Sequence, residues 1–280
     1  MSEVSRPAQL DHVALASDHA WDNLVRYVDH LGARWLGGPP VDGTRAFYFS
    51  QVELAGRTKL ELLEPLPHPG SEFLRRFLLR NGPGPHHLTF KVVDFDDALA
   101  SATAAGYDVI GVDRSNPSWM EAFLHPGQSH GIVIQLAHQG EEGDPWPEPG
   151  ELPPASRRPP RLVAVQHLVA DVEAARKLFT GPLAMDEAER RTDAEGETVV
   201  VTAGPWRLEL TQPARSDWRH WMGNRPGRLL QLVLEVEEPG AVPGARPLGS
   251  GRYELAPEHN LGTRVRLQAP PPPAPAAPAT

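Results

Sequence analysis

The 280-residue sequence contains no cysteine, which excludes disulfides, iron–sulfur clusters and thiolate chemistry. Any metal site would have to use His, Asp, Glu or Gln side chains. No apolar run approaches the ~20 residues that span a bilayer. The N-terminus also lacks the basic stretch and apolar segment of a signal peptide. We therefore expect a cytoplasmic protein without a membrane partner.

Positive charge is scarce as well. Only three of the 27 basic residues are lysine, and the formal net charge is −9. This acidic balance argues against nucleic acid or an anionic membrane surface as the partner. We expect a small-molecule substrate instead.

Proline marks the predicted domain boundaries. Residues 139–161 are rich in Pro and Glu and are predicted to form a linker, and the Pro/Ala-rich residues 269–280 are predicted to be a disordered tail. The linker separates two candidate domains, residues 8–138 and residues 162–268.

A repeated pattern of elements predicts the fold. In the first half, a short strand at 10–16 precedes a helical pattern at 19–32 and two further strand-like runs, and the order begins again at 86–93. The second half repeats it, with Asp171 as the predicted N-cap of its helix. A fourth copy is predicted to lack its helix, since Pro and Gly fill the corresponding stretch. This predicts an α+β fold of tandem βαβββ modules.

Four polar residues interrupt strands whose other face is apolar. His12 and His87 lie on the first strand of their copies, and Glu61 and Gln135 lie on the last. Glu61 follows His12 by 49 residues, and Gln135 follows His87 by 48. Since alternate side chains of a strand point to opposite faces, two copies packed side by side would direct all four to one concave face. Two imidazoles, a carboxylate and an amide oxygen suit a divalent Zn, Co, Ni, Mn or Fe ion with open positions for substrate.

On these segments the chain resembles the vicinal oxygen chelate superfamily of glyoxalase I, methylmalonyl-CoA epimerase, extradiol dioxygenases and bleomycin-resistance proteins. LDHVALA, KLELLEPL, GPGPHHLTFKV and HGIVIQLA are most similar to its epimerase-like branch. The resemblance covers nearly all of residues 8–138 and, more weakly, residues 162–268. It implies two glyoxalase-like domains, the second degenerate, and a metal held by His12, Glu61, His87 and Gln135.

The resemblance also assigns the neighbouring residues. It gives the ligand position to His87, which directly precedes the apolar Leu88. We expect His86 to face the core side beside it, and to support the ligand through a hydrogen bond or line the pocket. His125, in the family-like segment AFLHP, is assigned to the pocket wall or to a structural role. Lys91 shares a strand face with His87 and is also assigned to the pocket.

The proton-moving group is left open by the resemblance. Family members usually carry Glu as the last ligand, where this chain has Gln135. They also carry Glu shortly before a Gly-x-Arg segment, where this chain has Val41 followed by Asp42. Glu61, as both ligand and base, and Asp42 are therefore the alternative catalytic candidates.

The second half carries a different set at the corresponding positions. We align His167, Glu209, Gln231 and Arg266 with the four predicted ligands of the first half. An arginine repels a cation at its own binding site. The second half is therefore expected to bind no metal and to supply packing, a pocket wall or a separate binding surface.

Three functions are consistent with these residues. The first is a divalent-metal-dependent isomerase, epimerase or lyase that forms an enolate from a small acyl thioester or hydroxy-carbonyl substrate. The second is a ring-cleaving dioxygenase, which ranks lower because such enzymes carry a carboxylate ligand on the last strand, where this chain has the amide of Gln135. The third is a non-catalytic protein that binds a drug or other small molecule. We predict the first, in a monomer or homodimer, since the modules could pair within one chain or between two.

Overall fold

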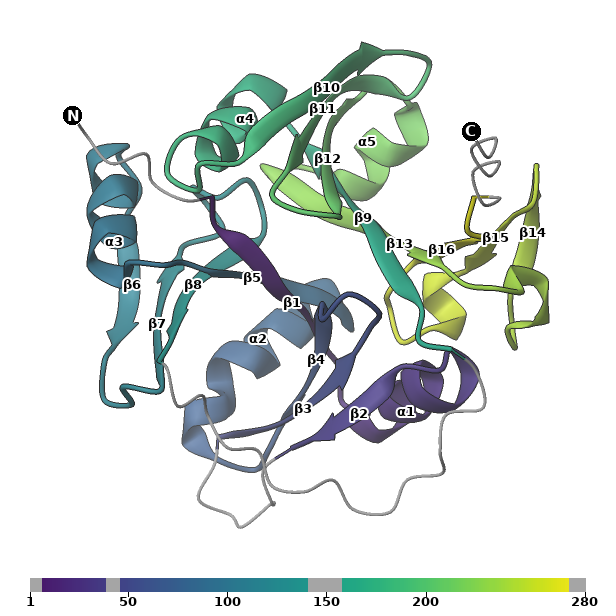
Figure 1. Ribbon diagram of the computed structural model, residues 1–280, viewed down its shortest axis with the longest axis horizontal. Helices are drawn as coiled ribbons and strands as arrows, with labels where there is room; N and C mark the ends of the chain where they lie inside the picture. The colour runs from purple at the N-terminus through teal and green to yellow at the C-terminus, as the bar shows by residue number, and fades with distance from the viewer. Residues whose placement is uncertain (1–6, 39–45, 141–157, 272–280) are drawn as a thin grey trace, which may run out of the picture.

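Each half of the chain builds one eight-stranded mixed sheet in the computed structural model, which describes residues 7–38, 46–140 and 158–271 (Figure 1). Within each half the strands form two modules with three strands after the first. This confirms the predicted α+β fold of tandem βαβββ modules. No helix of the described residues is long and apolar enough to cross a membrane.

The first sheet places the beginning and the end of each module at its centre. Its order is β2-β3-β4-β1-β5-β8-β7-β6, in which β1 pairs with β4 in parallel, β5 pairs with β8 in parallel, and β1 and β5 are antiparallel neighbours. The strands are β1 (Gln9–Ala16), β2 (Arg34–Gly37), β3 (Phe47–Glu53), β4 (Lys59–Pro65), β5 (Gly84–Lys91), β6 (Val109–Asp113), β7 (Trp119–Leu124) and β8 (Val133–Gln139). This order brings the four strands with predicted ligands side by side.

The second sheet repeats this topology with the order β10-β11-β12-β9-β13-β16-β15-β14. The strands are β9 (Arg161–Val169), β10 (Asp186–Thr192), β11 (Gly196–Thr202), β12 (Arg207–Pro213), β13 (Gly227–Glu235), β14 (Arg246–Gly249), β15 (Arg252–Leu255) and β16 (Val265–Gln268). In the last module a 3₁₀ turn, η3 (Pro239–Ala241), stands where the other modules have a helix. The predicted loss of that helix is confirmed.

Helices connect the strands. In the first half these are α1 (Ala20–Val25), which continues into the π-helical turn η1 (Arg26–His30), the 3₁₀ turn η2 (Pro69–Ser71), α2 (Glu72–Asn81) and α3 (Phe95–Ala104). The second half has α4 (Val172–Thr180), α5 (Ser216–Met222) and the 3₁₀ turn η4 (Pro257–His259). Asp171 caps α4 as predicted, because its side chain accepts a hydrogen bond from the Ala174 N–H at 2.9 Å.

The two halves share one apolar core. The Phe90 ring on β5 lies 6.2 Å from the Phe179 ring of α4 and 6.0 Å from the Trp206 ring, measured between centroids. The backbones also approach closely, since a Cβ added to Gly131 would lie 2.0 Å from the Gly227 carbonyl oxygen. The second half therefore covers the apolar side of the first sheet.

The domain boundaries remain a proposal. We retain residues 8–138 and 162–268 as the two domains, in agreement with the separate sheets. Most of the proposed linker, residues 139–161, and of the proposed tail, residues 269–280, lies outside the described residues.

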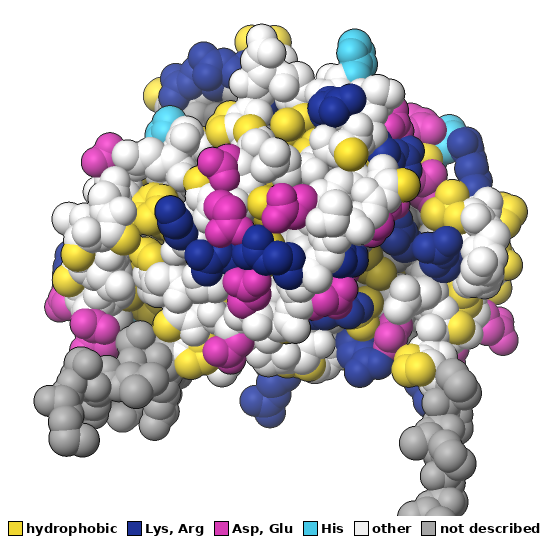
Figure 2. Space-filling model, turned by 90° about the horizontal axis from the view of Figure 1, so that it is seen from above, with side chains coloured by type: hydrophobic (Ala, Val, Ile, Leu, Met, Phe, Trp, Pro, Cys, Tyr) yellow, Lys and Arg dark blue, Asp and Glu magenta, His cyan; other side chains and the backbone are white. Residues whose placement is uncertain are grey.

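The outer face of the second half carries paired charges. Arg190 lies within 3.2 Å of both the Glu187 and the Glu197 carboxylates, and Arg191 lies within 3.2 Å of the Glu189 carboxylate. Figure 2, which views the molecule from the side of α4 and β10, shows acidic and basic side chains next to one another. Exposed pairs of this kind contribute little to stability, but they leave no uniformly basic surface here.

Candidate metal centre

Three of the predicted ligands form a cluster at the centre of the first sheet. The Glu61 carboxylate on β4 lies 3.5 Å from His12 Nε2 on β1 and 3.7 Å from His87 Nε2 on β5. All three ligand atoms lie within 4.8 Å of one another. His12 and His87 are buried and Glu61 is partly buried, so the three side chains face one enclosed point.

Gln135 borders this cluster. Its Oε1 accepts a hydrogen bond from the Thr89 hydroxyl, and its Nε2 donates to Glu121 on β7 at 2.6 Å. The Thr89 hydroxyl oxygen also lies 2.8 Å from His12 Nε2. Since the Thr89 proton points to Gln135, His12 Nε2 is the donor in that bond. Gln135 thus lines the same pocket as the three ligands.

A β-bulge fixes the orientation of His12. Between Leu10 and His12 the register of β1 against β5 shifts, so that Asp11 is an extra residue without a partner on β5. The Asp11 side chain therefore reaches the His12 ring and accepts a hydrogen bond from Nδ1 at 2.9 Å. A carboxylate on the second ring nitrogen fixes the tautomer of a metal-binding histidine.

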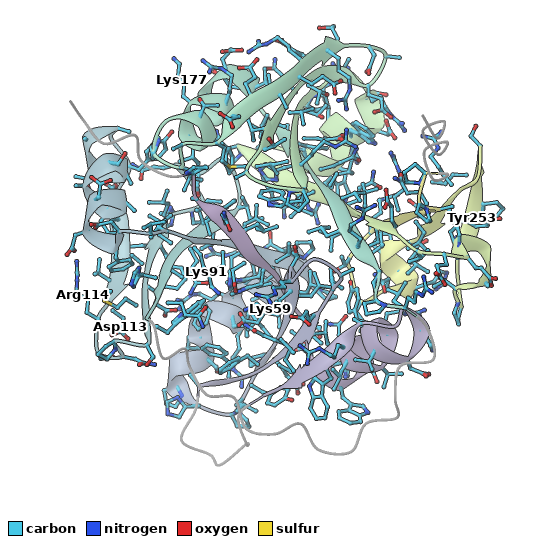
Figure 3. The ribbon with its side chains drawn as sticks, viewed as in Figure 1. Lys59, Lys91, Asp113, Arg114, Lys177 and Tyr253 are labelled. Carbon is cyan, nitrogen blue, oxygen red and sulfur yellow. The ribbon has the colours of Figure 1, made fainter. Side chains whose placement is uncertain are left out.

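Two lysines converge on Asp11. The Lys59 ammonium lies 2.8 Å from one carboxylate oxygen and the Lys91 ammonium lies 2.7 Å from the other. Figure 3 shows both lysines close together over the first sheet, whereas Lys177 lies at the far edge of the second half. The predicted pocket residue Lys91 thus acts on Asp11, and sequence reasoning missed both Asp11 and Lys59. The signal was present, because two of only three lysines occupy these strands.

The charges of the cluster are coupled. Burial disfavours protonated His12, but the Glu61 and Asp11 carboxylates outweigh burial and raise the pKa of His12 to about 9. Burial likewise disfavours ionised Glu61, but the His12 cation outweighs burial and lowers the pKa of Glu61 to about 2. The pKa of His87 lies well below its usual value because of burial and the neighbouring His86 ring. The cluster therefore holds one proton, on His12, next to a neutral His87.

His86 lies beside His87 as expected, but it faces the pocket rather than the core. A second shift of register makes His86 an extra residue of β5, so its side chain does not follow the alternation that would turn it to the core. Its Nδ1 lies 2.8 Å from His87 Nδ1, and its ring packs 4.7 Å from the Phe77 ring of α2. His86 thus lies beside the ligand and lines the pocket.

One predicted residue lies elsewhere. His125 accepts a hydrogen bond from the Gly127 N–H at 3.1 Å, within the turn that follows β7, and it does not line the pocket. Asp42 lies outside the described residues.

The donor set fits a divalent cation. His87 Nε2 is buried and has no hydrogen-bond partner among the described residues, although buried nitrogen atoms are rarely left unpaired. This nitrogen faces the Glu61 carboxylate at 3.7 Å and is the ring atom of His87 in position to bind a cation. Two imidazoles and a carboxylate are ligands that first-row divalent ions prefer.

The cluster forms one wall of a cavity of about 280 Å³. Aromatic side chains form much of the remaining wall, namely Phe47, Phe49, Phe73, Trp119 and Phe123. Glu121 is the second carboxylate that lines it, and its Oε2 accepts hydrogen bonds from Trp119 at 3.1 Å and from Gln135 at 2.6 Å. Sequence reasoning missed Glu121, since β7 carries no signal of the pairing that brings it to β8.

The register of the second sheet corrects one predicted equivalence. His12 pairs with Lys59 and Thr89, and in the second sheet the residue in that place is Ala164 rather than His167. His167 lies three positions further along the strand, where its Nε2 donates to the His130 carbonyl oxygen at 2.7 Å. It therefore joins the two halves.

The other three alignments agree with the strand register. Glu209, Gln231 and Arg266 occupy the places of Glu61, His87 and Gln135. The second half thus retains one of the three clustered ligands and places an arginine beside it.

Known proteins place the first half in a family. Residues 11–123 match the model of the Glyoxalase/Bleomycin resistance protein/Dioxygenase superfamily. This segment is a domain of that superfamily, as the sequence resemblance predicted. No curated protein sequence is similar enough to the chain to serve as a relative.

Several solved structures are similar to the chain, and one of them shares its fold over nearly the whole length. A hypothetical protein from Staphylococcus aureus covers 94% of this chain and 99% of its own, with a TM-score of 0.61 at 8% identity. Methylmalonyl-CoA epimerase from Mycobacterium tuberculosis covers 51% of this chain and 95% of its own, with 24% identity and a TM-score of 0.44. The hypothetical protein BH1468 from Bacillus halodurans C-125 covers 49% of this chain and 99% of its own, with 25% identity and a TM-score of 0.42. The first of these shows that both halves together form a known arrangement.

Proposed function

We propose that this protein is a divalent-metal-dependent isomerase, epimerase or lyase that removes a proton next to the carbonyl group of a small acyl thioester or hydroxy-carbonyl compound. One observation carries the proposal. The clustered ligand atoms of His12, Glu61 and His87 share a cavity with a second carboxylate, Glu121.

His12, Glu61 and His87 would hold the cation, with Gln135 beside them. A divalent cation in this place supplies a Lewis acid that polarises a substrate carbonyl and so acidifies the neighbouring C–H bond. Asp11 keeps the His12 ring in position through the hydrogen bond to Nδ1. The aromatic walls exclude water from the reacting end of the substrate, which strengthens electrostatic interactions there.

Glu121 is the proposed proton acceptor. The described part of the chain lines this cavity with two carboxylates, and Glu61 is committed to the ligand cluster. The donors Trp119 Nε1 and Gln135 Nε2 hold the Glu121 carboxylate against the same wall as the cluster. Burial raises the pKa of Glu121 above its usual value, which makes it a better proton acceptor than Glu61.

The test is exchange of the substrate α-proton with solvent deuterium, followed by NMR on metal-loaded protein. The substrates are methylmalonyl-CoA, 2-hydroxyacyl thioesters and hydroxy ketones. We expect Glu121→Gln to lower the exchange rate by about 10²–10⁴-fold, the usual contribution of a general base, while the bound metal remains. Asp42→Asn tests the alternative base, and Glu238→Gln, at an exposed position of the second half, is the control for a lost carboxylate.

Two results would count against the proposal. Metal-loaded wild-type protein that exchanges no α-proton across the panel would support a binding protein instead. Exchange that survives Glu121→Gln and is lost in Asp42→Asn would transfer the role of base to Asp42.

A further inference from the structure

A second cavity lies where the two halves of the chain meet. It has a volume of about 750 Å³, and we call it the junction cavity. The first half contributes the end of α2 and the start of β5, and the second half contributes the segment before β13 and the region from η4 to β16. Neither half alone encloses it.

Four arginines line the junction cavity, namely Arg26, Arg225, Arg228 and Arg264. Among the described residues, no carboxylate lies within 4.0 Å of the first three; Arg264 pairs with Glu254. Two carboxylates also line the cavity, of which Glu258 lies 3.8 Å from Arg246. The junction cavity therefore carries an excess of positive charge.

The two central arginines are held in place by neutral groups. The Arg228 guanidinium stacks 3.9 Å above the Trp221 ring and donates to the Trp221 carbonyl oxygen at 3.0 Å. Arg225 reaches across to the first half, where it donates to the Arg80 carbonyl oxygen at 3.4 Å. Stacked and tethered guanidinium groups lose little freedom when they bind an anion.

Several arginines on the outer face of the second half are paired with carboxylates, unlike Arg225 and Arg228. On the outer face of the second half, Arg190, Arg191 and Arg215 each lie within 4.0 Å of at least two carboxylates. Arg228 is half-buried, and burial together with the charge of Arg225 lowers its pKa to about 10. An anionic ligand would stabilise two half-buried positive charges that otherwise repel each other.

The junction cavity adjoins the metal pocket. His86 lines both, and its ring is hydrogen-bonded at 2.8 Å to His87, one of the clustered ligands. Phe77 packs against His86 on the side of the junction cavity, and Phe73 packs against it on the side of the metal pocket. The two spaces are therefore neighbours that share His86 as a wall residue.

We propose that the junction cavity binds a phosphorylated anion, and that this anion is the phosphate-bearing end of the substrate whose reacting end lies in the metal pocket. Planar guanidinium forks match phosphate oxygens in pairs, and Trp221 offers an aromatic surface beside them. The second clause rests on the proposed function, whereas the first does not.

The anion site is tested by calorimetric titration of the metal-free, full-length protein with inorganic pyrophosphate. Metal-free protein is needed because pyrophosphate itself binds divalent ions. We expect Arg225→Gln/Arg228→Gln to weaken binding at least about tenfold, since the variant loses the charge-assisted hydrogen bonds of two guanidinium groups. Arg76→Gln/Arg207→Gln removes the same charge from exposed positions and should bind as the wild type does.

A second variant separates this site from the proposed function. His12→Ala/His87→Ala removes two metal ligands and should still bind pyrophosphate with wild-type affinity. Thermal melting shows that each variant is folded, and Arg228→Lys, which keeps the charge but loses the fork, replaces the double variant if that does not fold. Wild-type protein that binds no pyrophosphate, or variants at Arg225 and Arg228 that bind it equally well, would overturn the proposal.

The source of the phosphate is tested with two thioesters that share an acyl group. Methylmalonyl-CoA carries phosphates, and the methylmalonyl thioester of N-acetylcysteamine carries none. In the exchange assay, Arg225→Gln/Arg228→Gln should raise KM for the first at least about tenfold with little change in kcat, and leave the second unchanged. Equal KM values for wild type and variant would show that the anion is a separate ligand and overturn the second clause. Absence of exchange with both thioesters would count against the proposed function, while the pyrophosphate titration would still decide the anion site.

Discussion

Binding of a divalent metal should release one proton from His12. At pH 7.5 a histidine with a pKa of about 9 is almost fully protonated, whereas His87 is neutral and Glu61 is already ionised. A metal ligand must present a lone pair, so the proton on His12 Nε2 has to leave. At pH 7.5 its removal takes about 2 kcal/mol, which is the pKa difference of 1.5 converted at 1.36 kcal/mol per unit.

The measurement is calorimetric titration of metal-free protein with Zn²⁺ at pH 7.5, in several buffers that differ in ionisation enthalpy. The slope of the observed enthalpy against the buffer enthalpy gives the number of protons released, which we expect to be close to one. The logarithm of the affinity should rise by about one for each pH unit between pH 7 and 8.5. In Asp11→Asn the number of released protons should fall, because one of the two carboxylates that stabilise protonated His12 is gone.

A slope near zero for the wild type would refute this reasoning, since it would show that His12 is neutral before the metal binds. The same slope in wild type and in Asp11→Asn would show that Asp11 does not hold the proton on His12. Lys177→Gln, on α4 of the second half, is a control that removes a charge without touching the cluster.

Two further predictions concern stability. The free energy of unfolding of the metal-free protein should fall by roughly 1–3 kcal/mol as the pH rises from 6.5 to 9, because the raised pKa of His12 stabilises the fold fully below pH 6.5 and no longer above pH 9. The lowered pKa of Glu61 has the opposite effect, and its stabilisation is lost as the pH falls from 4.5 toward 2. Urea titration with a chelator present measures both, and a free energy that does not change from pH 6.5 to 9 would contradict the first. Gly131→Ala should destabilise by more than about 2 kcal/mol, since its Cβ would lie 2.0 Å from the Gly227 carbonyl oxygen at a φ of +87°. Gly56→Ala, at a similar φ of +84° but with no atom within 4 Å of the added Cβ, is the control for backbone strain alone. Equal melting temperatures of the two variants would show that the contact between the halves does not contribute to stability.

The repeat made the centre of the site predictable. In a strand of regular alternation, residues at matched positions of two repeats share a face, and the parallel pairing of β1 with β4 brings His12 close to Glu61. A β-bulge interrupts this alternation of side chains. Asp11 and His86 are each the extra residue of a bulge, so both turn toward the cluster against the alternation.

Residues that act through tertiary pairing were not predictable from one sequence. Glu121 reaches the pocket because β7 pairs with β8, which brings it beside Gln135. The error at His167 has a different origin. As the histidine on the first strand of its half it resembles His12, but the register of β9 against β12 and β13 gives the place of His12 to Ala164. A histidine in a strand is a ligand only when the register points it at the others.

The two halves share one fold but carry different charges at the matching positions of their sheets. Where the first half has a cluster that suits a cation, the second half retains Glu209 and satisfies it with Arg191 at 3.0 Å and Gln166 at 2.6 Å. The Glu209 carboxylate is thus paired within its own half, unlike the clustered ligands of the first half. The second half covers the apolar side of the first sheet through Phe179, and it brings Arg228 to the junction with its charge unpaired by any described carboxylate. The duplication thus places the candidate metal pocket and the proposed anion cavity on either side of His86, and the second of these needs residues from both halves.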